Sequence, residues 1–118
     1  MIEFYFWQGC PSHERALAQL TAEMDANGLE PEHLRVTELF TEADAQRERF
    51  VGSPTIRIDG NDIADPGDEP AGLNCRLYRR RDGRPSPLPD PEDLAEAVRA
   101  YALASSAQRS AQHEGDQT

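Results

Sequence analysis

The sequence contains no lysine, so all 12 basic residues of this 118-residue chain are arginines. This absence excludes chemistry that depends on a lysine amine, such as Schiff-base catalysis or a Walker-type phosphate loop. Cysteine is almost as scarce, because only Cys10 and Cys75 are present. Two cysteines are too few for a disulfide-scaffolded module, and without a Cys-X-X-Cys pair they offer no ordinary structural zinc site.

Positive charge and long apolar runs are also in short supply. The 22 acidic residues outnumber the basic ones and give a net charge of −10 at pH 7. Such a field repels phosphate groups, so we expect no nucleic acid and no membrane among the partners. The apolar run at residues 2–7 lacks a basic flank and is far shorter than the ~18 residues of a spanning helix. We therefore expect a cytoplasmic protein, whose cysteines are thiols, transient redox partners or metal ligands rather than a permanent disulfide.

What is present suits a single compact domain. The length and the hydrophobic content of 37% allow one core and leave too little chain for a second. We expect this domain to span residues 1–104. Residues 105–118 are polar and aperiodic, so we expect them to form a disordered tail.

Hydrophobic periodicity predicts an α/β fold with the element order β-α-β-α-β-β-α, a mixed sheet and an extra short strand. A β-rich opening leads into a helical stripe that ends at Gly28, and Asp59-Gly60 marks a hairpin turn. The expected elements are strands at 2–7, 33–40, 54–58 and 62–64, helices at 11–27, 41–50 and 90–104, and the extra strand near 75–79.

Cys10 stands out because it comes directly after the first strand and before the first helix. Unpaired N–H groups at a helix start, together with the helix dipole, favour a negative group there. The thiolate is the reactive form of cysteine, so this position is suitable for a nucleophile. The alternative is a small buried residue that packs in the core.

Two motifs give the chain a family resemblance. Residues 7–11 read Trp-Gln-Gly-Cys-Pro after the first strand, and residues 51–55 read Val-Gly-Ser-Pro-Thr before the hairpin. In these motifs and in its order of elements, the chain resembles the thioredoxin/glutaredoxin superfamily. The resemblance implies a three-layer thioredoxin-like sandwich in which Pro54 follows a cis peptide bond and lies beside Cys10.

The same resemblance implies a function in thiol–disulfide exchange without a cofactor. Cys10 would be the nucleophile, acting on a small-molecule thiol or a protein disulfide. The residues expected to contact the substrate are Trp7, Pro11, Ser53, Pro54 and Thr55.

The chain departs from a dithiol enzyme at the position of the second cysteine. The motif reads Cys10-Pro11-Ser12-His13, so no resolving thiol lies within the helix. Cys10 could still act alone, with His13 one helical turn away stabilising the thiolate. His13 could equally be a solvated first-turn residue without a role, because a cation is electrostatically misplaced at a helix N-terminus.

Cys75 admits three interpretations. It is a resolving thiol that pairs with Cys10, a second thiolate of a soft-metal site, or an inert strand residue. The metal interpretation has its own resemblance, since small bacterial thioredoxin-like proteins described as alkylmercury-lyase-like share this set of motifs. Two thiolates with a carboxylate from Glu14 or Asp65 would suit a soft ion or an organomercurial. A redox-inactive thioredoxin-like binding module is a further alternative.

An arginine cluster follows Cys75. Residues 76–84 contain five arginines and a single acid, Asp82. The cluster could lower the pKa of Cys75 or attract an anionic partner. It could instead be a solvated hairpin whose charges protect a strand edge from aggregation. Its members are Arg76, Arg79, Arg80, Arg81 and Arg84.

Overall fold

The structure is a computed structural model that describes residues 1–116, with side chains described to residue 107. A four-stranded mixed sheet in the order β2-β1-β3-β4 forms its centre. Strand β1 (Ile2–Phe6) pairs parallel with β2 (Leu34–Glu38) and antiparallel with β3 (Thr55–Ile58). Strand β3 pairs antiparallel with β4 (Asn61–Asp62). The α/β class, the mixed sheet and the hairpin are therefore confirmed.

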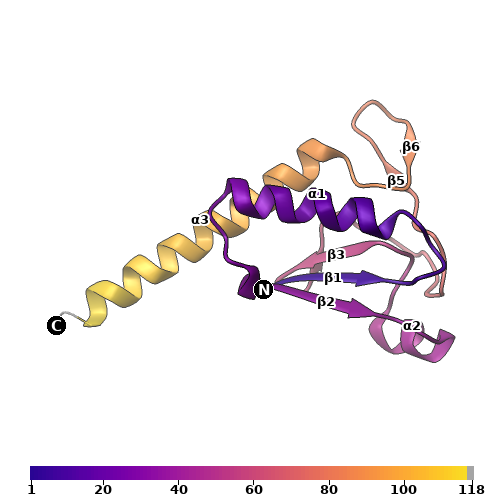
Figure 1. Ribbon diagram of the computed structural model, residues 1–118, viewed down its shortest axis with the longest axis horizontal. Helices are drawn as coiled ribbons and strands as arrows, with labels where there is room; N and C mark the ends of the chain where they lie inside the picture. Colours follow the sequence, from indigo (N-terminus) through magenta and orange to yellow (C-terminus); the bar gives the residue numbers. More distant parts are fainter. Residues whose placement is uncertain (117–118) are drawn as a thin grey trace.

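The alternation of side chains along β1 divides the core between the two faces of the sheet. Ile2 and Phe4 belong to the larger cluster, which buries residues of α1 (His13–Ala26) and α3 (Pro91–Asp116). Tyr5 belongs to a second cluster with residues of and around α2 (Glu42–Glu48). Figure 1 shows α1 and α3 along one side of the sheet, with α2 at its far end. Helices α1 and α3 thus cover one face, α2 packs near one end of the other, and a short turn connects the carboxyl end of β1 to the start of α1.

Local sequence signals account for several element boundaries. Thr41 and Asp44 form a reciprocal capping box at the start of α2, where the sequence predicts a helix. Asp59 and Gly60 both adopt positive φ angles in the turn between β3 and β4. A short 3-10 helix, η1 (Pro31–His33), precedes β2. These turns and caps bring β3 back against β1 and place its N-terminal end close to Cys10.

The extra strand expected near 75–79 takes a different form. Strand β5 (Tyr78–Arg79) pairs with β6 (Pro85–Ser86) in a separate two-stranded sheet. Figure 1 shows this hairpin standing away from the main sheet. Cys75 lies outside it and forms an isolated parallel bridge with Ser53 instead. The segment is therefore divided between a surface hairpin and a contact with the central domain.

Helix α3 extends further than the sequence predicts. A disordered tail is expected from residue 105, whereas the helix runs to Asp116. Residues 105–114 contain neither proline nor glycine, and their alanine, glutamine, arginine and glutamate residues favour helix, so an established helix can continue through them. Residues 117–118 of the expected tail lie outside the described residues. Neither α3 nor any other helix of the described chain combines the length and apolar character needed to cross a membrane.

Candidate functional site

Cys10 occupies the turn between β1 and α1, as predicted. Its amide donates a hydrogen bond to the Trp7 carbonyl at 3.1 Å, which bends the chain away from the strand. Ser12 is the N-cap of α1. The Cys10 thiol is free, and the residue is only 1% exposed. A free thiol therefore lies buried at a helix start, where the helix dipole favours negative charge.

The surroundings of the Cys10 sulfur lower its pKa. Burial is the largest single influence and acts to raise the pKa, but hydrogen bonds from Cys75, Ser12 and the Ser53 hydroxyl together outweigh it. The Ser12 hydroxyl lies 3.2 Å from the sulfur. When protonated, the thiol donates to the Ser53 carbonyl at 3.4 Å. The site thus accommodates both protonation states but favours the thiolate more than water does.

Cys75 reaches the site through a main-chain contact with Ser53. The Ser53 amide donates to the Asn74 carbonyl at 2.7 Å, and the Arg76 amide donates to the Ser53 carbonyl at 2.9 Å. These two bonds form the parallel bridge between Ser53 and Cys75. Cys75 is a free, exposed cysteine. The second cysteine, distant in sequence, therefore lies beside the first.

The two thiols hold their protons unequally. The pKa of Cys75 is raised to about 11, mainly because Cys75 hydrogen-bonds to Cys10. Burial of Cys75 and the charge of Cys10 act in the same direction. The same hydrogen bond lowers the pKa of Cys10. Interacting groups of this kind titrate as a pair. Cys10 therefore loses its proton before Cys75 does, and between these two ionisations the pair carries one proton on Cys75 and one negative charge on Cys10.

Arg76 anchors the segment that carries Cys75. Its guanidinium forms an ion pair with Asp62 at 2.6 Å, and the two side chains are only 7% and 10% exposed. It also donates to the Ala64 carbonyl at 2.5 Å and lies over the ring of Tyr78. The Tyr78 hydroxyl donates to the Pro54 carbonyl at 2.6 Å. Because Arg76 directly follows Cys75, these contacts fix the cysteine against the central domain.

Gly52 permits this close approach. Its φ angle is +152°, and a Cβ atom at this position would lie 2.8 Å from the Arg76 Cα. No other residue type fits there without moving the segment. Sequence reasoning missed the roles of Gly52, Asp62 and Arg76. The available signals were a glycine before Ser53 and an arginine directly after Cys75.

His13 does not contact the thiol. Its Nδ1 donates to the Cys10 carbonyl at 2.6 Å, and its ring stacks on Phe6 with the ring centroids 4.6 Å apart. The side chain is buried, which argues against a solvated residue. No contribution of His13 to the lowered pKa of Cys10 is resolved. The observed geometry therefore makes His13 a residue that fixes the turn around Cys10.

The residues expected to contact a substrate differ in accessibility. Pro11 is exposed, and Trp7 is half-buried. The Trp7 amide donates to the Ser53 hydroxyl at 3.1 Å. In contrast, Ser53, Pro54 and Thr55 are buried, and the Ser53–Pro54 peptide bond is cis. Of the expected contact residues, only Pro11 and Trp7 are open to solvent, because the chain itself covers the others.

The arginine cluster separates into structural roles. Arg76 is buried, whereas Arg79, Arg80 and Arg84 are exposed. Arg81 pairs with Glu92, Asp93 and Glu96 at the start of α3. No arginine is among the causes of the raised pKa of Cys75. The exposed arginines fit the interpretation of this segment as a solvated hairpin. Arg76 does not fit it, because its side chain is buried.

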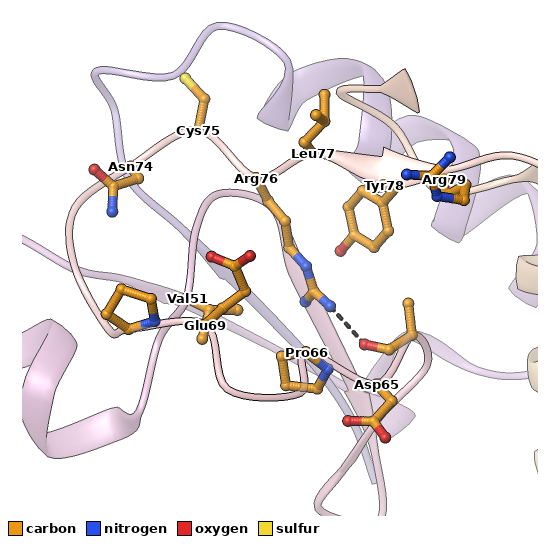
Figure 2. Close-up of a pocket in the computed structure, with 12 residues that line it drawn as sticks. Val51, Asp65, Pro66, Glu69, Asn74, Cys75, Arg76, Leu77, Tyr78 and Arg79 are labelled. Carbon is orange, nitrogen blue, oxygen red and sulfur yellow. Dashed lines mark hydrogen bonds between the residues drawn. The ribbon is translucent and has the colours of Figure 1, made fainter. Parts of the chain in front are cut away.

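A cavity of about 500 Å³ lies next to the Cys75 segment. Figure 2 shows the Arg76 side chain pointing into it and the Cys75 sulfur pointing away from it. Asp65 lines this cavity, so its carboxylate lies on the opposite side of the segment from the thiol. Glu14 is exposed on α1. Among the described side chains, no group of three or more His, Cys, Asp or Glu residues is arranged to hold a metal ion.

A scan against models of protein families returned no match for this chain, and neither did searches among curated proteins and solved structures. A functional conclusion therefore depends on the geometry of the site itself.

Proposed function

We propose that this chain is a thioredoxin-like redox protein that catalyses thiol–disulfide exchange, with Cys10 as the nucleophile and Cys75 as the resolving thiol. The observation that carries the proposal is the neighbouring pair of free cysteines with unequal pKa values. The thioredoxin-like topology is part of the proposal. It is supported by the mixed sheet, by the helices on both faces and by the position of Cys10 between β1 and α1.

The first step is attack by the Cys10 thiolate on a disulfide RS–SR′. A bond forms between Cys10 Sγ and one substrate sulfur, the S–S bond breaks, and the departing thiolate R′S⁻ takes a proton from solvent. The lowered pKa of Cys10 increases the fraction of the protein that is ready to attack. The product is a mixed disulfide on Cys10, with Cys75 still protonated beside it.

The second step follows from how the two thiols influence each other. The Cys10 thiolate is the main reason why the pKa of Cys75 is raised. Once Cys10 is part of a mixed disulfide this charge is gone, so Cys75 loses its proton more readily. Its thiolate then attacks Cys10 Sγ, the Cys10–Cys75 disulfide forms, and RS⁻ leaves and is protonated. The protein is oxidised by two electrons, the substrate is reduced to two thiols, and an external thiol must reduce the protein again.

Access to Cys10 lies on the side of Cys75. Cys10 is 1% exposed, whereas Cys75 faces solvent. A substrate would therefore reach the Cys10 sulfur past the side chain of Cys75, whose backbone is held by the hydrogen bonds of its neighbours to Ser53.

Single-cysteine variants test this assignment. Reduced Cys75→Ser should form a mixed disulfide with 2-hydroxyethyl disulfide at neutral pH faster than reduced Cys10→Ser does. Quenching with acid and intact-mass analysis measures both rates, and wild type should proceed to the intramolecular disulfide. A Cys10→Ser variant that reacts as fast as Cys75→Ser would show that the exposed cysteine attacks first.

The neighbouring thiols also support a second candidate function, a thiolate site for a soft metal ion. Two sulfurs without a third ligand suit an ion that accepts two-fold coordination, such as Hg(II), better than Zn(II), which takes four ligands. Calorimetric titration of the reduced protein should then show a 1:1 complex with Hg(II) that weakens strongly in Cys75→Ser. Unchanged affinity in this variant would argue against the metal function.

A further inference from the structure

We infer that residues 74–76 fill the main-chain edge beside Cys10, so that the site takes disulfides of small molecules in preference to disulfides in extended polypeptides. This inference rests on the proposed function and specifies its substrate class.

The first observation is that Ser53 has no main-chain group left for a substrate. An extended peptide is usually held by main-chain hydrogen bonds that add it to a strand edge. Beside the Cys10 sulfur, these groups are the amide and carbonyl of Ser53. The amide is bonded to Asn74 and the carbonyl to Arg76, at 2.7 and 2.9 Å. The chain therefore already holds its own strand where a peptide would pair.

The second observation is that this internal strand is firmly anchored. The buried ion pair of Arg76 with Asp62 connects it to β4, and the Tyr78 hydroxyl connects it to the Pro54 carbonyl. Displacing the segment would leave the largely buried Asp62 carboxylate without its cation partner, which is strongly unfavourable. A peptide would have to break these contacts before it formed its own. Residues 74–76 are thus a fixed part of the site and not a segment that a peptide displaces easily.

A small disulfide has no such requirement. It needs only to bring one sulfur into line with Cys10 Sγ, past the exposed side chain of Cys75, and it displaces no main-chain hydrogen bond. The large cavity does not change this conclusion, because it lies on the side of the segment away from the Cys75 sulfur.

The test uses two substrates with the same leaving group. One is the mixed disulfide of 2-mercaptoethanol with thionitrobenzoate, and the other is that of a linear peptide with a single central cysteine. Release of thionitrobenzoate from each is followed with reduced full-length protein. Each rate is divided by the rate with free 2-mercaptoethanol, which removes differences in intrinsic reactivity. We expect the normalised rate for the peptide to be lower by about thirty-fold, the effect of two missing main-chain hydrogen bonds.

Variants separate this inference from the proposed function. Cys10→Ser should abolish rapid release from both substrates. Asp62→Asn weakens the anchor and should bring the two normalised rates closer together, whereas Asp25→Asn, an exposed change at the far end of α1, should leave their ratio as in wild type. Equal normalised rates in wild type, with Cys10 still required, would overturn only the substrate class. No Cys10-dependent release from either substrate would overturn both proposals.

Hydrogen exchange keeps the inference testable if Asp62→Asn fails to fold. The amides of Ser53 and Arg76 should be protected in reduced wild type, since both are bonded within the bridge. Exchange of these two amides at the rate of exposed amides would show that the edge is open to peptides.

Discussion

The ionisation of the Cys10 thiol depends on a few neighbouring donors. Burial opposes ionisation of the Cys10 thiol, and the hydrogen bonds from Cys75, Ser12 and Ser53 reverse the outcome. Among these donors Cys75 is the largest influence, although it is the most distant in sequence. The chemistry of one thiol is therefore set by the other.

Replacing Cys75 should reveal this dependence. Cys75→Ala removes the donor, so the pKa of Cys10 should rise and alkylation by iodoacetamide at neutral pH should become slower. Cys75→Ser keeps a hydroxyl donor and should lie between Cys75→Ala and wild type. Because a lowered pKa means more thiolate at low pH, the pH–rate curve of Cys75→Ala should move to higher pH. Coincident curves for the two variants would show that the side chain at position 75 donates nothing to Cys10.

Arg76 should be the most sensitive of the arginines. Arg76→Ala leaves Asp62 buried without its partner, and loss of one member of a buried pair costs about 3–5 kcal/mol of unfolding free energy. Urea denaturation measures this loss. Arg81→Ala is the matched control, because its ion pairs are exposed and its effect should be much smaller. Equal losses in the two variants would contradict the anchoring role of Arg76.

At this scale the sequence predicts the position of Cys10 but not its neighbours. A cysteine between a strand and a helix start can be recognised from local pattern, and so can the Ser53-Pro54 loop. The sequence did not distinguish a thiolate partner from a structural residue at His13, because the direction of its ring depends on Phe6. The approach of Cys75 to Cys10 depends on a contact between distant segments, which no local pattern records.

Some elements of the fold stabilise the core, and others position the two cysteines. Helix α3 packs through its first turns, where Leu94 and Val98 are fully buried, while Leu103 further along is 66% exposed. Leu94→Ala should therefore destabilise the protein by about 2–5 kcal/mol, the usual cost of truncating a buried leucine. Leu103→Ala makes the same change in the same helix and should stay within about 0.5 kcal/mol of wild type. Thermal denaturation of both variants provides the comparison, and a similar loss for Leu103→Ala would contradict the described packing.

The loop before β3 and the segment after residue 73 form the positioning element. Gly52→Ala places a methyl group against the Arg76 main chain and forces the two apart. The expected result is a less stable protein in which Cys10 ionises at higher pH, since Cys75 moves with its segment. Alkylation rates of Cys10 measured against pH provide the readout. A variant that is destabilised but has an unchanged Cys10 pH profile would show that the bridge does not position Cys75.

Most of the helices and strands can be predicted from local sequence signals, but the segment between β4 and α3 cannot. The capping box at Thr41, the Asp59-Gly60 turn and the alternation along β1 each predict a feature that the structure contains. For residues 65–89 the sequence predicts only a short strand, because the path of this segment depends on the ion pair between Arg76 and Asp62 and not on hydrophobic periodicity. The expected end of α3 was early, since composition alone does not distinguish a polar helix from a disordered tail.

For the whole molecule, the two cysteines connect the start of α1 with the segment between β4 and β5. A Cys10–Cys75 disulfide closes a long loop and should stabilise the oxidised protein by about 2–4 kcal/mol. Urea denaturation of the oxidised and reduced forms measures the difference, and Cys75→Ser should show none. Oxidation that yields only disulfide-linked dimers would contradict an intramolecular pair.

The central claim is that Cys10 and Cys75 share one proton, with the negative charge on Cys10. The most direct measurement is a carbon NMR titration of the two cysteine Cβ atoms in the reduced protein. Cys10 should ionise below the ordinary cysteine pKa, and Cys75 should follow near 11, because the neighbouring Cys10 thiolate raises the pKa of Cys75. Independent titration of both cysteines at the ordinary value, or ionisation of Cys75 before Cys10, would contradict the account.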